Sequence, residues 1–487
     1  MRLERISFNV LFAIFSRVIT GGIGLFVIAV MSRSLGQAGY GNYSTILSYM
    51  LIFSVVGDLG LYTLLVREIS RNDKEESYIA SNFFTLRLIT IAVTAILAIL
   101  ISEFLTPYPR LVKDGLIVGT IFLVFSSLTQ VLSGIYQKYL RFYLISFADI
   151  LSSLVQLAII LFVASKGRDL LPYVWAASIA SLVQFSIVFI NVQKLVPISL
   201  HISFSFWRKI LKDSLPVAVS LVFTVIYFRI DTIMLSLIKT PNEVGIYSIA
   251  AKVLEVIIFL PALYMGLVMP VLSKEAVSNV TNFRRIFKKT FDILAAFSVP
   301  TVVFLAILSA KIVVIVGGST FLASYQPLFI LAFAVGLIFF GNLVGRAAVA
   351  LDLQKRSMWI YLGGAILNII LNLLLIPSFS FNGAAFATLM TELFITLALF
   401  RLVSVNSGAK IDYFRFFKFL FLGLAMALVI YPLRNQFILI PVFVGSLVYF
   451  GGVYAFKIFS REDLISLIKE GRLSEKEASI FEKDLPV

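Results

Sequence analysis

The segment Tyr227–Glu255, YFRIDTIMLSLIKTPNEVGIYSIAAKVLE, decides how this chain folds. Two apolar runs flank the short polar stretch KTPNE, so the segment predicts two helices joined by a tight turn. Each helix carries two charges deep in its apolar run, Arg229 and Asp231 on the first and Lys252 and Glu255 on the second. Charges at such depth are costly, and they therefore indicate either a functional site or a buried ion-pair network.

The composition of the whole chain indicates an integral membrane protein. Hydrophobic residues make up 60% of the 487 residues and charged residues only 14%, whereas soluble domains are about 45–50% apolar and about 25% charged. There is no cysteine, which excludes thiol catalysis, disulfides and thiolate metal sites, and the single histidine, His201, falls in a loop. We therefore expect no metal and no cofactor. The net charge of +15 is typical of cytoplasmic anchoring, so we expect no nucleic-acid partner.

Runs of about 20 apolar residues are long enough to cross a bilayer as helices. Fourteen such runs are predicted, at 8–30, 40–66, 80–104, 114–135, 144–165, 170–192, 214–238, 246–270, 289–310, 324–351, 357–377, 382–400, 416–433 and 436–456. Only Arg434 and Asn435 separate the last two runs, which leaves a re-entrant hairpin open there. The predicted fold class is all-α, a polytopic membrane protein with about fourteen transmembrane helices.

Lysine and arginine are concentrated in alternate loops, which sets the orientation of the chain. The enriched loops lie on the same side as both termini, so we predict a multi-pass protein of the cytoplasmic membrane with both termini in the cytoplasm. The longest loops predicted on that side are 193–213 and 271–288. No predicted outer loop is large enough for a catalytic domain, and no G-x-x-x-x-G-K-[ST] phosphate loop occurs, so the sequence favours a transporter over an enzyme.

A short repeat occurs at two equivalent places in the predicted topology. Gly41-Asn42-Tyr43-Ser44 opens the second span and Gly245-Ile246-Tyr247-Ser248 opens the eighth. Because the copies lie six spans apart, the repeat predicts two lobes with the same orientation in the membrane. The predicted division is an N-terminal lobe at 1–200, a C-terminal lobe at 201–405, two extra spans at 406–456 and a cytoplasmic tail at 457–487. The tail is expected to form an amphipathic helix.

Short motifs follow one another along nearly the whole chain. They are LG at 35–36 with GYGNY at 39–43, GDLGL at 57–61 and REIS at 67–70; RIDTIML at 229–235 with VGIY at 244–247; and NIILN at 368–372 with IP at 376–377 and NGAA at 382–385. The ordered set resembles the Wzx-type polysaccharide flippases of the multidrug/oligosaccharidyl-lipid/polysaccharide exporter superfamily, which includes MATE-like transporters. This resemblance implies two six-helix lobes around a central cavity, with two further helices at the C-terminus.

The resemblance also implies a function. A flippase of this type moves a lipid-linked oligosaccharide or polysaccharide repeat unit to the outer leaflet by alternating access, for cell-surface polysaccharide or glycan biosynthesis. The implied partners are a polyprenyl phosphate or pyrophosphate carrier, membrane lipids, H⁺ or Na⁺ as a coupling ion, and glycosyltransferases or a polymerase of the same pathway. Two alternatives stay open: an ion-coupled multidrug or organic cation exporter of the same superfamily, and a membrane-embedded glycan enzyme.

Cations within the predicted spans are candidates for holding the carrier's phosphate, because arginine forms paired hydrogen bonds with phosphate. Asparagines at i and i+4 on one helix are candidates for sugar hydroxyls, although such residues also hydrogen-bond neighbouring helices. The substrate-binding candidates are Arg17, Arg229, Lys252, Arg346, Asn368 and Asn372. Of the other charges, Arg87 is expected to extend its side chain to the inner interface, and Asp149 is expected to be interfacial.

Carboxylates within the spans are candidates for coupling transport to an ion gradient, or for pairing with the cations. They are Asp58, Asp231, Glu255 and Glu392. Glu392 is the lone charge of its span. Arg17 and Asp58 have similar depth on adjacent antiparallel helices, which predicts that they form a pair.

The charges of the opening segment allow two further predictions. Lys252 and Glu255 stand at i and i+3 on one helical face, so we predict an ion pair between them. Arg229 and Asp231 point about 200° apart around a helix, so one of them is expected to reach a different helix.

Overall fold

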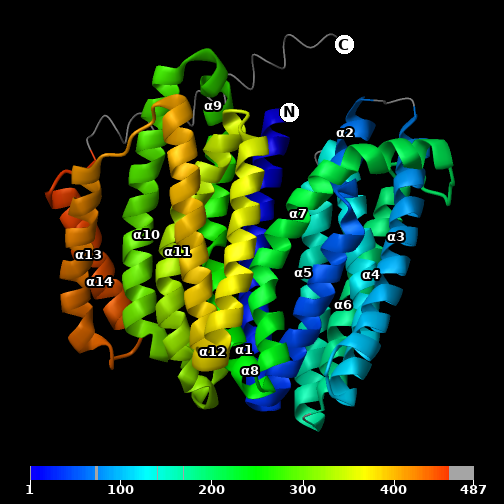
Figure 1. Cartoon of the computed structure of the whole chain (residues 1–487), viewed down its shortest axis with the longest axis horizontal. Coiled ribbons are helices and arrows are strands. Elements are labelled where there is room, and N and C mark those ends of the chain that lie inside the picture. Colours follow the sequence, from blue (N-terminus) through cyan, green and yellow to red (C-terminus); the bar gives the residue numbers. More distant parts are fainter. Residues whose placement is uncertain (1, 72–74, 140, 168, 460–487) are drawn as a thin grey trace. The chain divides into compact units, whose positions relative to one another are not determined.

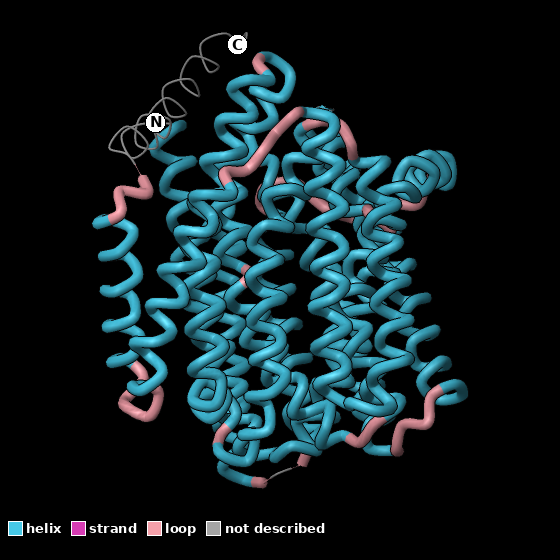
Figure 2. Tube along the Cα trace, turned by 60° about the vertical axis from the view of Figure 1, so that its left-hand side comes forward, coloured by secondary structure: helices cyan, strands magenta, loops and turns pink. Residues whose placement is uncertain are grey.

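The computed structural model describes residues 2–71, 75–139, 141–167 and 169–459. Fourteen α-helices, α1 to α14, account for most of these residues, and no strand occurs among them (Figures 1 and 2). Ten helical segments of the described chain are long and apolar enough to cross a membrane. The predicted all-α, multi-pass class is confirmed. The helix predicted for the tail at 457–487 falls almost wholly beyond residue 459, where the described residues end.

The chain forms two compact units. The first contains Met1–Ser248 and Val316–Thr320, and the second contains Ile249–Ile315 and Phe321–Val487. The helices of the first unit are α1 (Arg2–Asp58), α2 (Leu61–Arg71), α3 (Glu76–Leu105), α4 (Arg110–Lys138), α5 (Phe142–Lys166), α6 (Leu170–Gln193), α7 (Phe204–Ile238) and the start of α8 (Pro241–Ile257). Because α7 packs along α1, it belongs to the first unit. The predicted lobe boundary at residue 200 stays a prediction.

The second unit holds the remaining helices. These are α9 (Phe259–Ser278), most of α10 (Val280–Gly317), α11 (Tyr325–Ala350), α12 (Gln354–Ser407), α13 (Tyr413–Leu433) and α14 (Leu439–Ala455). A short turn joins α13 to α14, and the two helices pack against each other. Arg415 at the start of α13 pairs with the buried Asp292 of α10 at 3.1 Å, which attaches this helix pair to the rest of the unit.

Two of the long helices contain a sharp change of direction, and each therefore supplies two predicted spans. In α1 the change occurs at Gly36, with φ 67° and ψ −173°. This left-handed conformation is open to glycine because it has no Cβ. In α12 the change occurs at Ser380, three residues after Pro377. The predicted spans 8–30 and 357–377 thus each share one helix with the span that follows.

The loops predicted at 193–213 and 271–288 are shorter than expected, because helix occupies the end of the first stretch and nearly all of the second, and their cytoplasmic side stays a prediction. α7 already begins at Phe204, and only Asn279 separates α9 from α10. The first turns of α7 bury Trp207 and Ile210 and expose the charged residues between and after them. A search for runs of apolar residues does not find such an amphipathic segment, because about half of its residues are polar. Its buried residues nevertheless have the spacing of one face of a helix.

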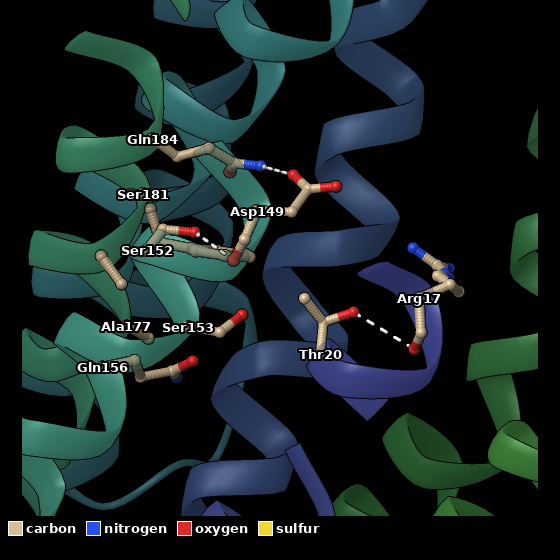
Figure 3. Close-up of a pocket in the computed structure, with 11 residues that line it drawn as sticks. Arg17, Thr20, Asp149, Ser152, Ser153, Gln156, Ala177, Ser181 and Gln184 are labelled. Atoms are coloured by element: carbon tan, nitrogen blue, oxygen red, sulfur yellow. Dashed lines mark hydrogen bonds between the residues drawn. The ribbon is translucent and has the colours of Figure 1, made fainter. Parts of the chain in front are cut away.

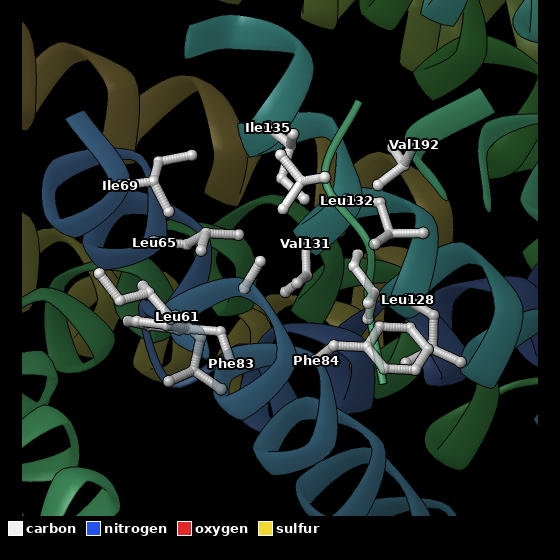
Figure 4. Packing of buried hydrophobic residues seen from close by; sticks show 14 of the residues in the cluster. Leu61, Leu65, Ile69, Phe83, Phe84, Leu128, Val131, Leu132, Ile135 and Val192 are labelled. Carbon is white, nitrogen blue, oxygen red and sulfur yellow. The ribbon is translucent and has the colours of Figure 1, made fainter. Parts of the chain in front are cut away.

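The second predicted span, 40–66, likewise ends earlier than expected. α1 stops at Asp58, and α2 continues as a separate amphipathic helix after a turn with positive φ at Leu59 and Gly60. The apolar face of α2 enters a hydrophobic cluster with α3, α4 and the end of α6 (Figure 4). Leu61, Leu65 and Ile69 supply this face at i, i+4 and i+8, which is the spacing of one side of a helix.

The two copies of the G-x-Y-S repeat lie against each other where α1 crosses α8. A Cβ built on Gly41 would lie 1.9 Å from the carbonyl oxygen of Pro241, and one built on Gly245 would lie 2.2 Å from that of Gln37. No side chain fits at either position unless the backbone moves. Small residues allow membrane helices to approach this closely, so the glycine of each repeat is required by its contact with the other copy.

Candidate functional site

A polar cavity of about 260 Å³ lies within the first unit, between helices that are apolar elsewhere (Figure 3). Helix α5 provides a run of polar side chains to it, α6 provides a second run, and α1 provides an arginine. The lining residues are Arg17, Thr20, Phe122, Asp149, Ser152, Ser153, Gln156, Ala177, Ala180, Ser181 and Gln184. A concave site with a few convergent polar groups is where a membrane transporter is expected to bind polar cargo.

The spacing of the polar residues on α5 explains why they share one wall. Asp149, Ser152, Ser153 and Gln156 stand at i, i+3, i+4 and i+7, which places all four on one side of a helix. The neighbouring positions on α5 are mostly apolar. The sequence prediction missed this site because it considered charges one at a time, whereas the signal was a polar stripe with helical period in an apolar span.

Asp149 is held in place by its neighbours. Its carboxylate accepts a hydrogen bond from Gln184 Nε2 at 2.5 Å, and its backbone carbonyl accepts one from Ser152 Oγ at 3.0 Å (Figure 3). Asp149 lies seven residues into α5, or about 10 Å along the helix axis. Its side chain is half-buried in the wall of the cavity, and its expected interfacial position stays a prediction.

Arg17 reaches the same cavity from α1, and its side chain is exposed. The adjacent residue Ser16 is buried and donates a hydrogen bond to the carbonyl of Ser146 at 3.0 Å, which attaches this part of α1 to α5. The cavity therefore combines a guanidinium, one carboxylate and several neutral donors and acceptors. A guanidinium suits a phosphate, and hydroxyls and amides suit the hydroxyl groups of a sugar.

The predicted pair between Arg17 and Asp58 is wrong. Asp58 instead pairs with Arg87 of α3 at 3.0 Å, and the side-chain exposures are 4% and 0%. Arg87 also donates to Gln130 Oε1 at 3.2 Å and is too deeply buried to reach the interface as expected. The prediction compared depths along two helices, and depth does not say which neighbouring helix a side chain faces. Here α3 packs directly on this arm of α1, where Thr90 Oγ1 donates to the carbonyl of Gly57.

The charges of the opening segment include one ion pair and one buried carboxylate. Lys252 and Glu255 form the predicted ion pair at 2.9 Å, with side-chain exposures of 39% and 27%. Asp231 is buried and accepts a hydrogen bond from Tyr247 Oη of α8 at 2.9 Å. Asp231 is thus a residue that reaches a different helix, as one of that couple was expected to do. Arg229 lies half-buried on α7.

The remaining candidates lie in the second unit. Asn368 and Asn372 are fully buried on α12, and Asn372 Nδ2 donates to Asn368 Oδ1 at 3.0 Å. Glu392 is also buried on α12, and Arg346 is half-buried on α11. Their roles in binding or coupling stay predictions. Within the described ranges, no group of three or more histidine, aspartate or glutamate side chains is arranged to hold a metal ion.

The sequence matches a family of known proteins over more than half of its length. Residues 7–275 match the profile of the family described as polysaccharide biosynthesis protein. The probable flippase AglR of Haloferax volcanii is 28% identical over 247 residues, which are 50% of this chain and 50% of that protein. The chain therefore matches about half the length of this curated relative.

Two solved structures share the fold. The lipid II flippase MurJ in an inward closed conformation has a TM-score of 0.78, covering 94% of this chain and 99% of that chain at 18% identity. An inward-facing multidrug resistance MATE family transporter of the MOP superfamily has a TM-score of 0.62, covering 82% of this chain and 99% of that chain at 13% identity. At these identities the likeness shows the fold alone, and it is the fold that the motif resemblance implied.

Proposed function

We propose that this chain, which belongs to the polysaccharide biosynthesis protein family, is a flippase that moves a lipid-linked oligosaccharide or polysaccharide repeat unit across the cell membrane by alternating access. The observation that carries the proposal is the cavity in which Arg17 and Asp149 meet a stripe of hydroxyls and amides among membrane-spanning helices. The relative AglR is named a probable flippase and MurJ a lipid II flippase, and both names support a flippase.

The cavity binds one part of the cargo rather than all of it. Its volume of about 260 Å³ lies below the roughly 300–1,000 Å³ typical of pockets that enclose a whole drug-sized ligand. In this proposal Arg17 holds a phosphate oxygen of the polyprenyl carrier, while Ser153 and Gln156 hydrogen-bond the first sugar. The lipid tail stays in the bilayer, so only the polar head group has to leave water.

Transport requires the cargo to bind differently in the two access states, because a ligand with equal affinity for both states shifts neither. Arg17 serves this purpose if its guanidinium meets the phosphate in the inward-open state alone. We propose that both termini are cytoplasmic, as the distribution of lysine and arginine predicts, so that the cargo enters from the side where it is synthesised. Glycosyltransferases or a polymerase of the same pathway would supply and consume it.

The other predicted residues remain part of the proposal. Arg229, Lys252, Arg346, Asn368 and Asn372 are candidates for further contacts with the head group. Asp58, Asp231, Glu255 and Glu392 are candidates for coupling to H⁺ or Na⁺. Asp58 is the weakest of these, because its salt bridge to the buried Arg87 already accounts for its charge.

An organic cation exporter is the second candidate function, and Asp149 is the observation that favours it. A half-buried carboxylate in a membrane cavity attracts cations, and the fold is shared with a MATE family transporter. Arg17 in the same cavity opposes this function, because it repels a cation at close range. We therefore place the flippase first.

Reconstitution distinguishes the two functions. The purified chain is placed in liposomes, and movement between leaflets is measured for fluorescent polyprenyl-pyrophosphate oligosaccharides, with and without a pH or Na⁺ gradient. Uptake of an organic cation dye is measured in parallel. The flippase proposal requires protein-dependent movement of the lipid-linked sugar. Dye transport without movement of any lipid-linked sugar would establish the exporter instead.

A further inference from the structure

A second cavity, of about 240 Å³, lies at the end of the first unit where α1 changes direction. Its walls come from the second arm of α1, the link between α3 and α4, and the turn from α7 into α8. Asn42, Thr45, Tyr108, Ser236 and Pro241 are among its lining residues. The α3–α4 and α7–α8 links are predicted to face the outside of the cell, opposite the side from which the cargo is proposed to enter.

The walls of this outer cavity are fixed to one another before any ligand arrives. Tyr108 Oη lies 2.7 Å from Ser236 Oγ, which joins the α3–α4 link to the end of α7. The close crossing of Gly41 with Pro241 holds α1 against the start of α8. Prolines at 107, 109 and 241 restrict the backbone of two walls, because the ring of proline fixes φ. A preformed pocket loses little conformational entropy on binding.

The lining has the mixed chemistry that a sugar ring requires. Asn42 offers an amide, while Thr45, Tyr108 and Ser236 offer hydroxyls, and Thr45 and Tyr108 are themselves buried. The aromatic ring of Tyr108 and the neighbouring prolines form an apolar surface between these groups. A sugar presents hydroxyls around its edge and C–H groups on its faces. Thr45 and Ser236 donate to backbone carbonyls of the protein, and Tyr108 Oη and Ser236 Oγ bond each other. The hydroxyl oxygens keep lone pairs that accept from sugar hydroxyls, and the amide of Asn42 both donates and accepts.

We propose that this outer cavity is a subsite for a single hydroxylated sugar ring, occupied by a sugar of the cargo after translocation and before release. The occupant named here rests on the proposed flippase function, whereas the affinity of the cavity for a sugar ring rests on its own lining. The two cavities thus differ in their lining: the inner one contains Arg17, which suits a phosphate, together with Asp149, whereas the outer one is lined by neutral polar and apolar groups and by one charged residue, Lys239.

The absence of native cysteine allows a direct test, because a single introduced cysteine is then the only thiol in the chain. Asn42→Cys places this thiol in the outer cavity. The full chain in nanodiscs is labelled with a small maleimide in the presence of glucose, galactose, mannose or N-acetylglucosamine. We expect at least one of these sugars to slow the labelling of Asn42→Cys several-fold with saturable dependence on its concentration.

The matched control is Asp169→Cys, at an exposed position in the α5–α6 link on the same end of the unit and outside the cavity. Its labelling should be unaffected by any sugar. Adding Ser236→Ala to Asn42→Cys should weaken the protection, since it removes one hydroxyl from the cavity. Equal labelling of Asn42→Cys with and without all four sugars would overturn the subsite, as would equal slowing of both cysteines.

The test separates this inference from the proposed function. Protection of Asn42→Cys requires no flipping and should persist in a chain that also carries Arg17→Ala. Protection in a protein that flips no lipid-linked sugar would retain the outer site and reject the flippase. Flipping without protection would retain the flippase and reject the outer site.

Discussion

The first unit contains two combinations of arginine with aspartate, and their surroundings are opposite. Arg87 and Asp58 are sealed among packed helices, at 3.0 Å from each other and with exposures of 0% and 4%. Arg17 and Asp149 border a cavity of about 260 Å³ together with several neutral polar groups. A charge within a membrane helix therefore does not by itself indicate a binding site. What distinguishes the two is that the first pair is sealed among buried groups, whereas the second combination borders a cavity.

The largest effect is expected from breaking the sealed pair. Arg87→Ala leaves the carboxylate of Asp58 buried without its cation, and removing one partner of a buried pair costs about 3–5 kcal/mol. We expect a large drop in the melting temperature of the purified protein and in the amount that reaches the membrane. The double variant Arg87→Met with Asp58→Asn should recover most of this stability, because it removes both charges.

A matched control for this variant is Arg110→Ala. Arg110 lies in ion pairs with Glu103 and Asp114, but its side chain is 68% exposed. Exposed pairs contribute about 0–1 kcal/mol. If Arg87→Ala were as stable as Arg110→Ala, the sealed pair would have no structural role and the contrast with the cavity would fail.

The next effect concerns transport rather than stability. Arg17→Ala should reduce flipping about tenfold or more, because hydrogen bonds to charged groups contribute about 1.5–3 kcal/mol. The melting temperature should change little, since the side chain of Arg17 is exposed. The measurement is flipping rate per folded protein in liposomes, compared with thermal unfolding of the same preparation. Arg17→Lys should restore only part of the rate, because lysine cannot form paired hydrogen bonds with phosphate.

A substitution at Asp149, with a smaller expected effect, tests whether the cavity prefers an anionic or a cationic ligand. Asp149→Asn keeps the size of the side chain and a hydrogen-bonding partner for Gln184, but it removes a negative charge close to the proposed phosphate. We expect a few-fold lower cargo concentration for half-maximal flipping, because repulsion between like charges is relieved. In an organic cation exporter, the same change would instead abolish cation transport. A higher cargo concentration for half-maximal flipping would contradict the proposed preference of the cavity for an anion.

The smallest effect is expected at Lys252 and Glu255, which form an ion pair that is neither sealed nor within the cavity. A partly exposed i, i+3 pair contributes about 0.2–0.5 kcal/mol. Glu255→Gln should therefore shift thermal unfolding only slightly. A loss of stability as large as that of Arg87→Ala would show that exposure is a poor guide to the strength of these pairs. A loss of gradient dependence in flipping, with stability retained, would instead support the coupling role predicted for Glu255.

Predictions about residues within one helix were more successful than predictions about contacts between helices. The Lys252–Glu255 pair was predictable, because the geometry within one helix fixes which residues share a face. The Arg17–Asp58 pair failed, because a partner on another helix depends on the rotation of both helices. The stripe of Asp149, Ser152, Ser153 and Gln156 was visible in the sequence as a helical period of polar residues. The candidate residues were chosen as single charges within spans, so the prediction did not include this cavity.

The helical architecture was easier to predict from the sequence than the candidate site. Length and apolar composition fix a membrane helix almost alone, so the spans and the fold class followed from the sequence. The exceptions were α2 and the start of α7, whose alternating buried and exposed faces lower the average apolarity of each stretch. The approach of Gly41 to Gly245 also required the structure, since the repeat indicated equivalent places but not that the two copies touch.

The most direct test of the account is a comparison of Arg17→Ala, Arg17→Lys and Arg110→Ala in the same flipping assay, at equal amounts of folded protein. Arg17 lines the cavity and Arg110 lies at the exposed start of α4, and both changes to alanine remove one positive charge. We expect that Arg110→Ala flips lipid-linked oligosaccharide at the wild-type rate, that Arg17→Lys is intermediate, and that Arg17→Ala is slower about tenfold or more. Wild-type flipping by Arg17→Ala would contradict the assignment of this cavity to the cargo's phosphate.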